Sequence, residues 1–433
     1  MEAKDTLIRF LRIPSISATG EGIEDTANFL SEIMKSMGIK TEIEKAGGNP
    51  VIFGEINVGS KKTILIYNHY DVQPVDPLNE WKHPPFSAIE ENNRIYARGS
   101  SDNKGTLIAR LFAIKDLMDK GELGVNVKFL YEGEEEIGSV HLENYIEKNK
   151  DKLKADSVLM EGSSLDYKGR PLIVLGVKGL LYVELSLDYG LKDLHSSNAP
   201  IVKNPCWDMV KVLNSLIRED GNIDIDGFYE DIRNLTEEEE ELLDQYDINY
   251  EEIKKSLGNF PMKYENRNDI VKALLTYPTC NIDGMEAGYT GKGSKTIVPH
   301  KIVVKMDFRL VPDQDPYKIL SGLKEKLKSI GFSGEIKVLG AERPVRTSLS
   351  SEIVKATKNA AKEVYGNYII IPNSAGTQPM GLFVYNLGIK DAVSAIGVGD
   401  PSSNPHAPNE SISLDNFYKA IKHTQLTLIN YSM

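Results

Sequence analysis

The first 175 residues alternate between two kinds of hydrophobic pattern. Residues 22–38 (GIEDTANFLSEIMKSMG) carry apolar side chains every three to four positions and end in a glycine, which indicates an amphipathic helix. Short apolar runs, such as TILIYNH at residues 63–69, lie between such segments and are typical of buried strands. This alternation predicts an α/β fold with a mainly parallel sheet and flanking helices.

The pattern changes near residue 178. Residues 179–190 and 301–311 alternate apolar and polar side chains, which is typical of antiparallel strands with one exposed face. A helix–strand pattern returns near residue 345 and continues to the last helical segment. We therefore expect one α/β domain made of residues 1–177 and 345–433, interrupted by an inserted α+β domain of residues 178–344. A very acidic helical segment is expected within the insertion.

Carboxylates and imidazoles follow three of the predicted strands. In open α/β sheets, ligands bind beyond the carboxyl ends of the strands, so these side chains lie where a site is expected. His69 and Asp71 are two positions apart, and this spacing puts both side chains on one side of an extended chain. The groups at these strand ends are His69 and Asp71, Glu135 and Glu136, and Glu161.

Two further residues complete a possible metal site. Asp102 directly precedes a predicted helix, and His406 lies in the late motif NPHAPNE. Two metal ions bridged by one carboxylate need an imidazole and a carboxylate for each ion, the bridge, and a free carboxylate to activate water. Ligands of this kind without thiolates suit zinc, manganese or cobalt. We expect two divalent ions, with zinc favoured and manganese or cobalt as alternatives.

Composition limits the classes of function. The net charge is -12 and no long basic run occurs, which argues against nucleic acid as a partner. No apolar stretch reaches the length of a membrane helix, and the N-terminus lacks the apolar core of a signal peptide. Only two cysteines occur, Cys206 and Cys280, far apart in the sequence. These features favour a soluble, cytoplasmic protein.

The motifs together are more specific than any one of them. NHYDVQP, ARGSSDNKG, EGEEEIGS, DFRLVP and HAPNE, in this order, resemble the M20 family of metallopeptidases and amidohydrolases. The branch they resemble is that of carnosinase and the cytosolic nonspecific dipeptidase, because the acidic insertion at residues 220–257 is absent from shorter members. The resemblance implies a catalytic α/β domain and an inserted lid through which the chain forms a homodimer.

The resemblance also implies a role for each residue at the metal site. Asp102 would bridge the two ions, His69 and Glu161 would complete one coordination shell, and Glu136 and His406 would complete the other. Glu135 would be the general base that takes a proton from water. Asp71 would accept a hydrogen bond from His69 or hold Glu135 in its orientation.

Candidate residues for substrate binding lie outside this cluster. Arg309 in DFRLVP is expected to bind a carboxylate, because a guanidinium pairs with it through two hydrogen bonds. The resemblance adds Thr296, Gly376 and Thr377 as substrate-binding residues. It also implies that His195, in KDLHSS, reaches the partner subunit's site and stabilises the oxyanion.

The sequence therefore predicts a dinuclear metal-dependent hydrolase of dipeptides or short peptides with a free C-terminal carboxylate. One alternative is an N-acyl amino acid deacylase of the desuccinylase or deacetylase type, whose site would be the same. Another is a non-catalytic protein whose acidic groups bind Ca²⁺. The imidazoles argue against calcium, which prefers oxygen ligands.

Overall fold

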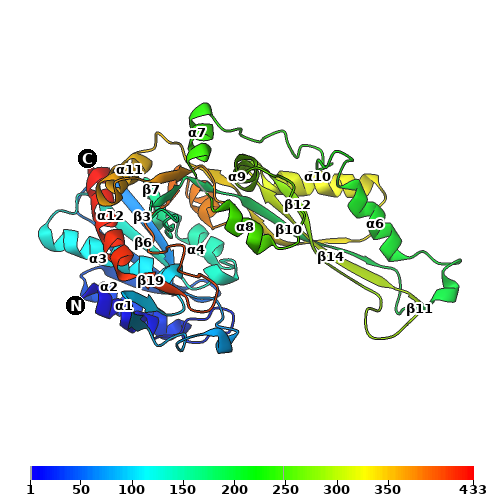
Figure 1. Cartoon of the computed structure of the whole chain (residues 1–433), viewed down its shortest axis with the longest axis horizontal. Coiled ribbons are helices and arrows are strands. Elements are labelled where there is room, and N and C mark those ends of the chain that lie inside the picture. Colours follow the sequence, from blue (N-terminus) through cyan, green and yellow to red (C-terminus); the bar gives the residue numbers. More distant parts are fainter. Residues whose placement is uncertain (1, 247) are drawn as a thin grey trace.

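The computed structural model describes residues 2–246 and 248–433. The chain forms an α/β body, which contains both termini, and a long arm that extends from it (Figure 1). Among the described residues, no helix is long and apolar enough to cross a membrane.

An eight-stranded sheet forms the centre of the body, with the strand order β1–β2–β6–β3–β7–β18–β8–β17. The four central strands β6, β3, β7 and β18 are parallel, whereas β1 and β2 run antiparallel to their neighbours at one edge. The predicted α/β class with a mainly parallel sheet is thus confirmed. The strands are β1 (Lys40–Lys45), β2 (Pro50–Ile56), β3 (Thr63–His69), β6 (Asn126–Glu132), β7 (Ser157–Met160), β8 (Leu172–Val174), β17 (Ile369–Ile371) and β18 (Asp391–Ser394).

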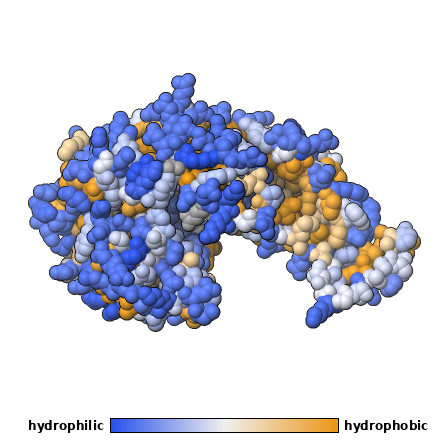
Figure 2. Space-filling model, viewed as in Figure 1, coloured by the Kyte–Doolittle hydropathy of each residue, from blue (hydrophilic) through white to orange (hydrophobic). Residues whose placement is uncertain are grey.

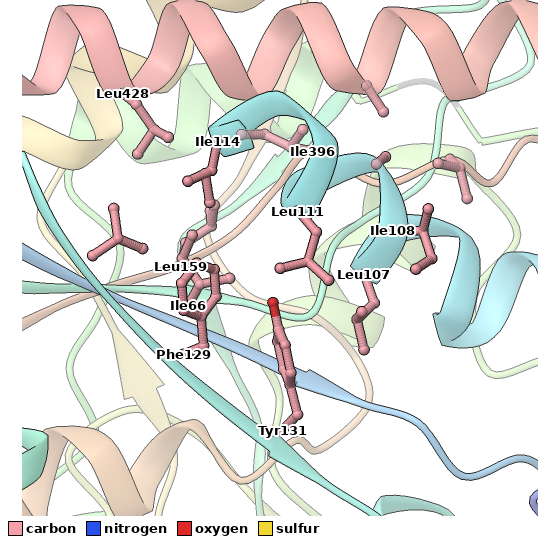
Figure 3. Close-up of a cluster of buried hydrophobic side chains, with 14 of the residues drawn as sticks. Ile66, Leu107, Ile108, Leu111, Ile114, Phe129, Tyr131, Leu159, Ile396 and Leu428 are labelled. Atoms are coloured by element: carbon pink, nitrogen blue, oxygen red, sulfur yellow. The ribbon is translucent and has the colours of Figure 1, made fainter. Parts of the chain in front are cut away.

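Both faces of this sheet are covered, because successive residues of a strand point to opposite faces. On β3, Ile64 and Ile66 belong to one hydrophobic core, and Leu65 and Tyr67 belong to another. Figure 3 shows part of the first core. The helices of the first core are α1 (Ala3–Leu11), α2 (Ile23–Ser36), α3 (Gly105–Lys120), α11 (Glu352–Tyr365) and α12 (Leu414–Ser432), and those of the second are α4 (Leu142–Lys148) and α5 (Lys150–Leu153).

The arm is built on a second sheet of four antiparallel strands in the order β12–β14–β10–β15. Buried and less buried residues alternate along β10 and β14, as the sequence pattern predicts. Two helices cover one face of the sheet and form a separate core with it. These elements are β10 (Gly179–Asp188), β12 (Thr279–Ala287), β14 (Lys301–Leu310), β15 (Glu335–Glu342), α6 (Pro205–Ser215) and α10 (Pro316–Ser329).

Three helices, two from the acidic insertion and one that follows it, join the arm to the body. They are α7 (Glu237–Gln245), α8 (Tyr250–Leu257) and α9 (Arg267–Thr276), and residue 247, inside the predicted acidic segment, lies outside the described residues. Leu243 of α7 and Val271 and Leu275 of α9 pack against Ile369 and Ile371 of β17. The insertion therefore covers the edge of the large sheet.

Short strands complete the structure. Val177 pairs with Val345, so the two segments that lead into and out of the arm lie side by side. We propose that the inserted domain of residues 178–344 begins and ends at this pair. The short strands are β4 (Ile89–Glu91), β5 (Arg94–Tyr96), β9 (Gly176–Val177), β11 (Leu194–His195), β13 (Ile297–Val298), β16 (Val345–Arg346) and β19 (Ser411–Ser413).

Candidate metal centre

The carboxyl ends of three neighbouring parallel strands hold the first group of polar side chains. His69 is the last residue of β3, which lies between β6 and β7. Glu135 and Glu136 follow β6, and Glu161 follows β7. Because parallel strands end at the same edge of a sheet, side chains far apart in sequence meet here.

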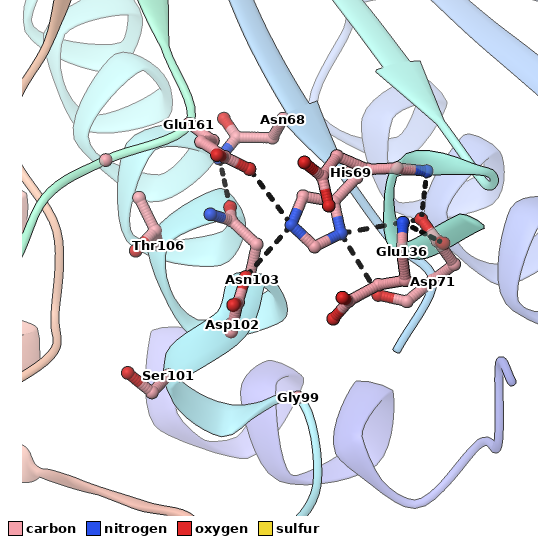
Figure 4. A network of polar contacts seen from close by, with 12 residues as sticks. Asn68, His69, Asp71, Gly99, Ser101, Asp102, Asn103, Thr106, Glu136 and Glu161 are labelled. Atoms are coloured by element: carbon pink, nitrogen blue, oxygen red, sulfur yellow. Dashed lines mark hydrogen bonds and ion pairs between the residues drawn. The ribbon is translucent and has the colours of Figure 1, made fainter. Parts of the chain in front are cut away.

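His69 is buried at the centre of this cluster and uses both ring nitrogens (Figure 4). Its Nε2 lies 3.0 Å from Asp102 Oδ1 and 3.0 Å from Glu161 Oε2. Its Nδ1 lies 3.1 Å from the backbone oxygen of Asp71 and 3.4 Å from the Asp71 carboxylate. Burial alone would lower the pKa of His69, but the three carboxylates outweigh it and raise the pKa well above its ordinary value.

Asp102 lies between two imidazoles. Its Oδ1 contacts His69, and its Oδ2 lies 3.1 Å from Nε2 of His406, which is also 3.1 Å from Glu136 Oε2. Burial would raise the pKa of Asp102, but hydrogen bonds from both imidazoles hold it far below its usual value. Each oxygen of Asp102 thus has its own imidazole, and the Nε2 atom of each imidazole also contacts one further carboxylate, that of Glu161 or Glu136.

Glu135 lies beside this cluster but differs from the other acids. A carboxylate oxygen of Glu135 lies within 4.8 Å of a ring nitrogen of His69 and of a carboxylate oxygen of Glu161. Within the described part of the chain, its carboxylate has neither a hydrogen bond nor an ion pair. Burial and the charge of Glu161 raise the pKa of Glu135 to about 10.

Asp71 and Gln73 fix the turn that carries the two glutamates. The Asp71 carboxylate accepts hydrogen bonds from the backbone N–H groups of Glu135, at 3.3 Å, and Glu136, at 3.0 Å. The side chain of Gln73 donates to Glu136 Oε2 at 2.9 Å. Asp71 therefore contacts both His69 and the backbone of Glu135, the two contacts that the sequence analysis weighed.

The residues that hold Asp102 in place were missed by the sequence analysis. Glu410 is buried and accepts backbone hydrogen bonds from Gly99, Ser101 and Asp102 at 2.8 to 3.0 Å. It also pairs with the buried guanidinium of Arg98 at 2.9 Å. Glu410 lies in the motif HAPNE, which was quoted for His406, but no local pattern signals a partner that is more than 300 residues away.

The chemistry of the cluster fits divalent metal ions. Four acidic side chains, those of Asp102, Glu135, Glu136 and Glu161, surround two imidazoles and no thiolate. Glu161 Oε2 is buried and shares the Nε2 atom of His69 with Asp102, each at 3.0 Å. Buried acids this close repel one another, and bound cations would remove that repulsion.

Three of the predicted substrate-binding residues lie at the base of the arm. Arg309, on β14, donates from Nη1 to Thr377 Oγ1 at 2.8 Å. Gly376 precedes Thr377, and its backbone oxygen accepts a hydrogen bond from the N–H of Lys178 at 3.2 Å. The loop that carries Gly376 and Thr377 belongs to the body, so this contact crosses between the body and the arm.

The fourth, Thr296, lies elsewhere, beside His195, the residue predicted to stabilise the oxyanion. His195 ends β11, which pairs with β13, and the backbone N–H of Ser196 donates to the oxygen of Thr296 at 3.1 Å. Figure 1 shows β11 at the far end of the arm from the body. Within one chain, therefore, Thr296 lies next to His195 and away from Arg309.

Comparison with known proteins gives the family of the chain. Residues 65–430 match the model of peptidase family M20/M25/M40. The Cys-Gly metallodipeptidase dug1 of Schizosaccharomyces pombe is 29% identical over 96% of this chain and 92% of that protein. The human Beta-Ala-His dipeptidase is 28% identical over 86% of this chain and 76% of its own length.

Solved structures extend the likeness to the fold. The M20 family metallo-carboxypeptidase Sso-CP2 from Sulfolobus solfataricus is 65% identical, with a TM-score of 0.95 over 100% of this chain and 99% of that one. The dipeptidase Dug1p from Saccharomyces cerevisiae is 28% identical, with a TM-score of 0.78 over 99% and 95% of the two chains. The chain therefore belongs to peptidase family M20/M25/M40 and is a metallopeptidase.

Proposed function

We propose that this metallopeptidase hydrolyses the peptide bond before a C-terminal residue with a free carboxylate, in dipeptides or short peptides. The observation that carries the proposal is the Asp102 carboxylate between His69 and His406, with the unpaired Glu135 beside them. The names of similar proteins, a metallo-carboxypeptidase and two dipeptidases, support this class of substrate.

Two divalent ions are proposed as the cofactor. His69 and Glu161 would hold one ion, His406 and Glu136 the other, and Asp102 would bridge them. Bound there, the ions supply Lewis acidity that lowers the pKa of the attacking water and polarises the substrate carbonyl. Zinc is favoured for these ligands, with manganese or cobalt as alternatives.

Glu135 is proposed as the general base. Bound cations would offset the neighbouring negative charge that raises its pKa, so that the ionised carboxylate takes a proton from water as the water oxygen attacks the carbonyl carbon. The same carboxyl group then gives that proton to the nitrogen of the leaving amine, which leaves as a neutral group. Asp71 holds the backbone of Glu135 through the hydrogen bond at 3.3 Å and so positions the base.

Arg309 and Thr377 are proposed to bind the C-terminal carboxylate of the substrate, with Gly376 beside them. A guanidinium that already donates to Thr377 Oγ1 has further N–H groups for a carboxylate. The proposal gives Arg309 a role in substrate binding rather than in the cleavage step.

His195 and Thr296 are proposed to act in the site of a partner chain, within a homodimer formed through the arm. The arm carries exposed apolar side chains, which would be covered in a dimer. Figure 2 shows apolar colour gathered on the arm. Leu191, Ile201 and Trp207 are among its exposed residues. From the arm, His195 would donate a hydrogen bond to the oxyanion that forms in the partner chain's site when water attacks.

A substrate panel tests the proposal. Chelation of the purified protein should remove its activity, and addition of zinc, manganese or cobalt, each separately, should restore it. The restored protein should hydrolyse dipeptides such as Ala-Leu faster than N-acetyl or N-succinyl amino acids. The opposite order of kcat/KM would instead assign it to the N-acyl amino acid deacylases.

Arg309→Ala gives the matching test of the carboxylate contact. It should raise KM for Ala-Leu by about tenfold or more, since a charge-assisted pair is lost. The same peptide with an amidated C-terminus should be a poor substrate of the wild type and should lose little further in the variant. Equal losses for the acid and the amide would make Arg309 a structural residue.

A further inference from the structure

A large cavity lies between the helical insertion and the sheet of the arm. Its volume is about 1330 Å³, several times that of any amino-acid side chain. Arg309, Lys178 and Ala375 line it where the arm meets the body. Side chains of residues 217–278, from the segment after α6 to the segment after α9, form most of the remaining wall.

Two cations lie close together in the cavity wall. Lys178 is only 4% exposed, and its Nζ donates to the backbone oxygen of Tyr277 at 2.7 Å. Burial and the nearby charge of Arg309 lower the pKa of Lys178 to about 8. A carboxylate bound at Arg309 would be attracted by both cations and would relieve their mutual repulsion.

The rest of the wall mixes polar side chains with apolar ones that are open to solvent. Aromatic and aliphatic side chains that a folded chain usually buries remain between 38% and 78% exposed around this cavity. An apolar ligand group placed among them would remove this surface from water. The side chains are those of Ile217, Tyr229, Leu257, Phe260, Leu274 and Tyr277.

A smaller cavity lies beside the large one and reaches the loop after β7. Its volume is about 400 Å³, and Gly162 and Ser163, the two residues after Glu161, line it together with Gly376. The two cavities share Leu274 and Ala375 in their walls, so they adjoin. The large cavity, with Arg309 in its wall, thus adjoins a hollow lined by the loop that follows Glu161.

We propose that the large cavity binds the side chain of the substrate's C-terminal residue and selects large aliphatic or aromatic side chains over glycine. This inference rests on the proposed function. The carboxylate and the side chain of one residue share a Cα atom, so a carboxylate at Arg309 directs the side chain into the same cavity. Residues 217–278 are then specificity-determining, although none of them belongs to the metal centre.

The test compares Ala-Phe with Ala-Gly on the full chain, loaded with the metal that gives the highest activity. The wild type should hydrolyse Ala-Phe with a kcat/KM at least about tenfold higher, because even one buried methylene changes discrimination by that order. Ala273→Trp, on α9, should fill the cavity and lower kcat/KM for Ala-Phe about tenfold or more. Its kcat/KM for Ala-Gly should change less than about twofold.

A second variant removes an apolar side chain from the cavity wall instead of adding a larger one. Each of the two variants has a matched control. Leu257→Ser exchanges a partly exposed leucine of the wall and should lower the Ala-Phe to Ala-Gly ratio at least about threefold. Ala3→Trp and Leu78→Ser make the same exchanges at partly or largely exposed positions that line neither cavity. Both controls should keep the wild-type ratio.

The outcomes separate this inference from the proposed function. The inference would be overturned if both peptides were hydrolysed without a preference for Ala-Phe. It would also be overturned if neither cavity variant changed the ratio of kcat/KM for Ala-Phe to that for Ala-Gly. Either result would leave the proposed function intact. Absence of hydrolysis for every peptide with a free carboxylate would overturn the proposed function, and the inference with it.

Discussion

Glu135 and Glu136 are neighbours in sequence whose carboxylates have different surroundings. Glu136 contacts His406 and Gln73, whereas the Glu135 carboxylate pairs with none of the described residues. Acids in different environments can take different roles in one site, because each environment sets its own pKa. The adjacent pair therefore suits one metal ligand and one proton carrier.

Glu135→Gln should lower kcat by about 10²- to 10⁴-fold, the usual contribution of a general base. The metal content per chain and the melting temperature should stay near those of the wild type, because the amide keeps the shape of the side chain. Glu136→Gln is the matched control and should lose bound metal. Elemental analysis together with steady-state kinetics checks both variants, and metal loss in Glu135→Gln would remove Glu135 from the role of base.

At the scale of elements, α11 and α12 meet around a buried histidine. His423 of α12 is fully buried, and its Nε2 lies 3.1 Å from the backbone oxygen of Thr357 on α11. Burial, together with the charge of Arg110 of α3, lowers the pKa of His423 to about 4, although the hydrogen bond to Thr357 acts to raise it. The packing of α11 on α12 thus requires a neutral imidazole.

This burial makes the stability of the fold sensitive to acid. Between about pH 6.5 and pH 4 the unfolded chain binds a proton at His423 that the native chain does not, so the free energy of unfolding falls as the pH falls. His423→Gln keeps a donor for Thr357 but cannot be protonated. From pH 7 to pH 4 the wild type should lose about 3 kcal/mol more than the variant. Urea unfolding at several pH values measures this, and parallel curves would contradict it.

At the scale of the whole molecule, the arm separates two groups of proposed functional residues. The metal centre lies in the body, whereas β11 with His195 is at the far end of the arm (Figure 1). A two-fold symmetric dimer would bring the arm of each chain to the body of the other, since both subunits use the same surface. The arm would then carry His195 of each chain to the site of the other.

Hybrid dimers test this arrangement. His195→Ala and Glu135→Ala, each inactive alone, should regain about a quarter of wild-type activity after they are unfolded and refolded together. Random assortment makes half of the dimers hybrids, and each hybrid has one intact site of two. Verified hybrids without activity would show that His195 serves its own chain or that a different dimer forms.

The sequence by itself determined the local structure and the kind of chemistry. Hydrophobic periodicity depends on neighbours within a few positions, so it predicted β3, α2 and the alternating strands β10 and β14. Polar residues at the ends of buried strands pointed to a shared edge, where the structure does bring His69 and Glu161 together. The ligand types favoured divalent metals without any geometry, because ligand preference is a property of the side chain.

Only the tertiary structure decided how these groups face one another. The position of Asp102 between His69 and His406 depends on Glu410, which contacts it across some 300 residues of sequence, and no local pattern encodes such a contact. The wall of the large cavity is likewise assembled from segments that meet only after the insertion packs on the body. Burial and distance in three dimensions set pKa values and cavity shape, so these emerge only when the chain is folded.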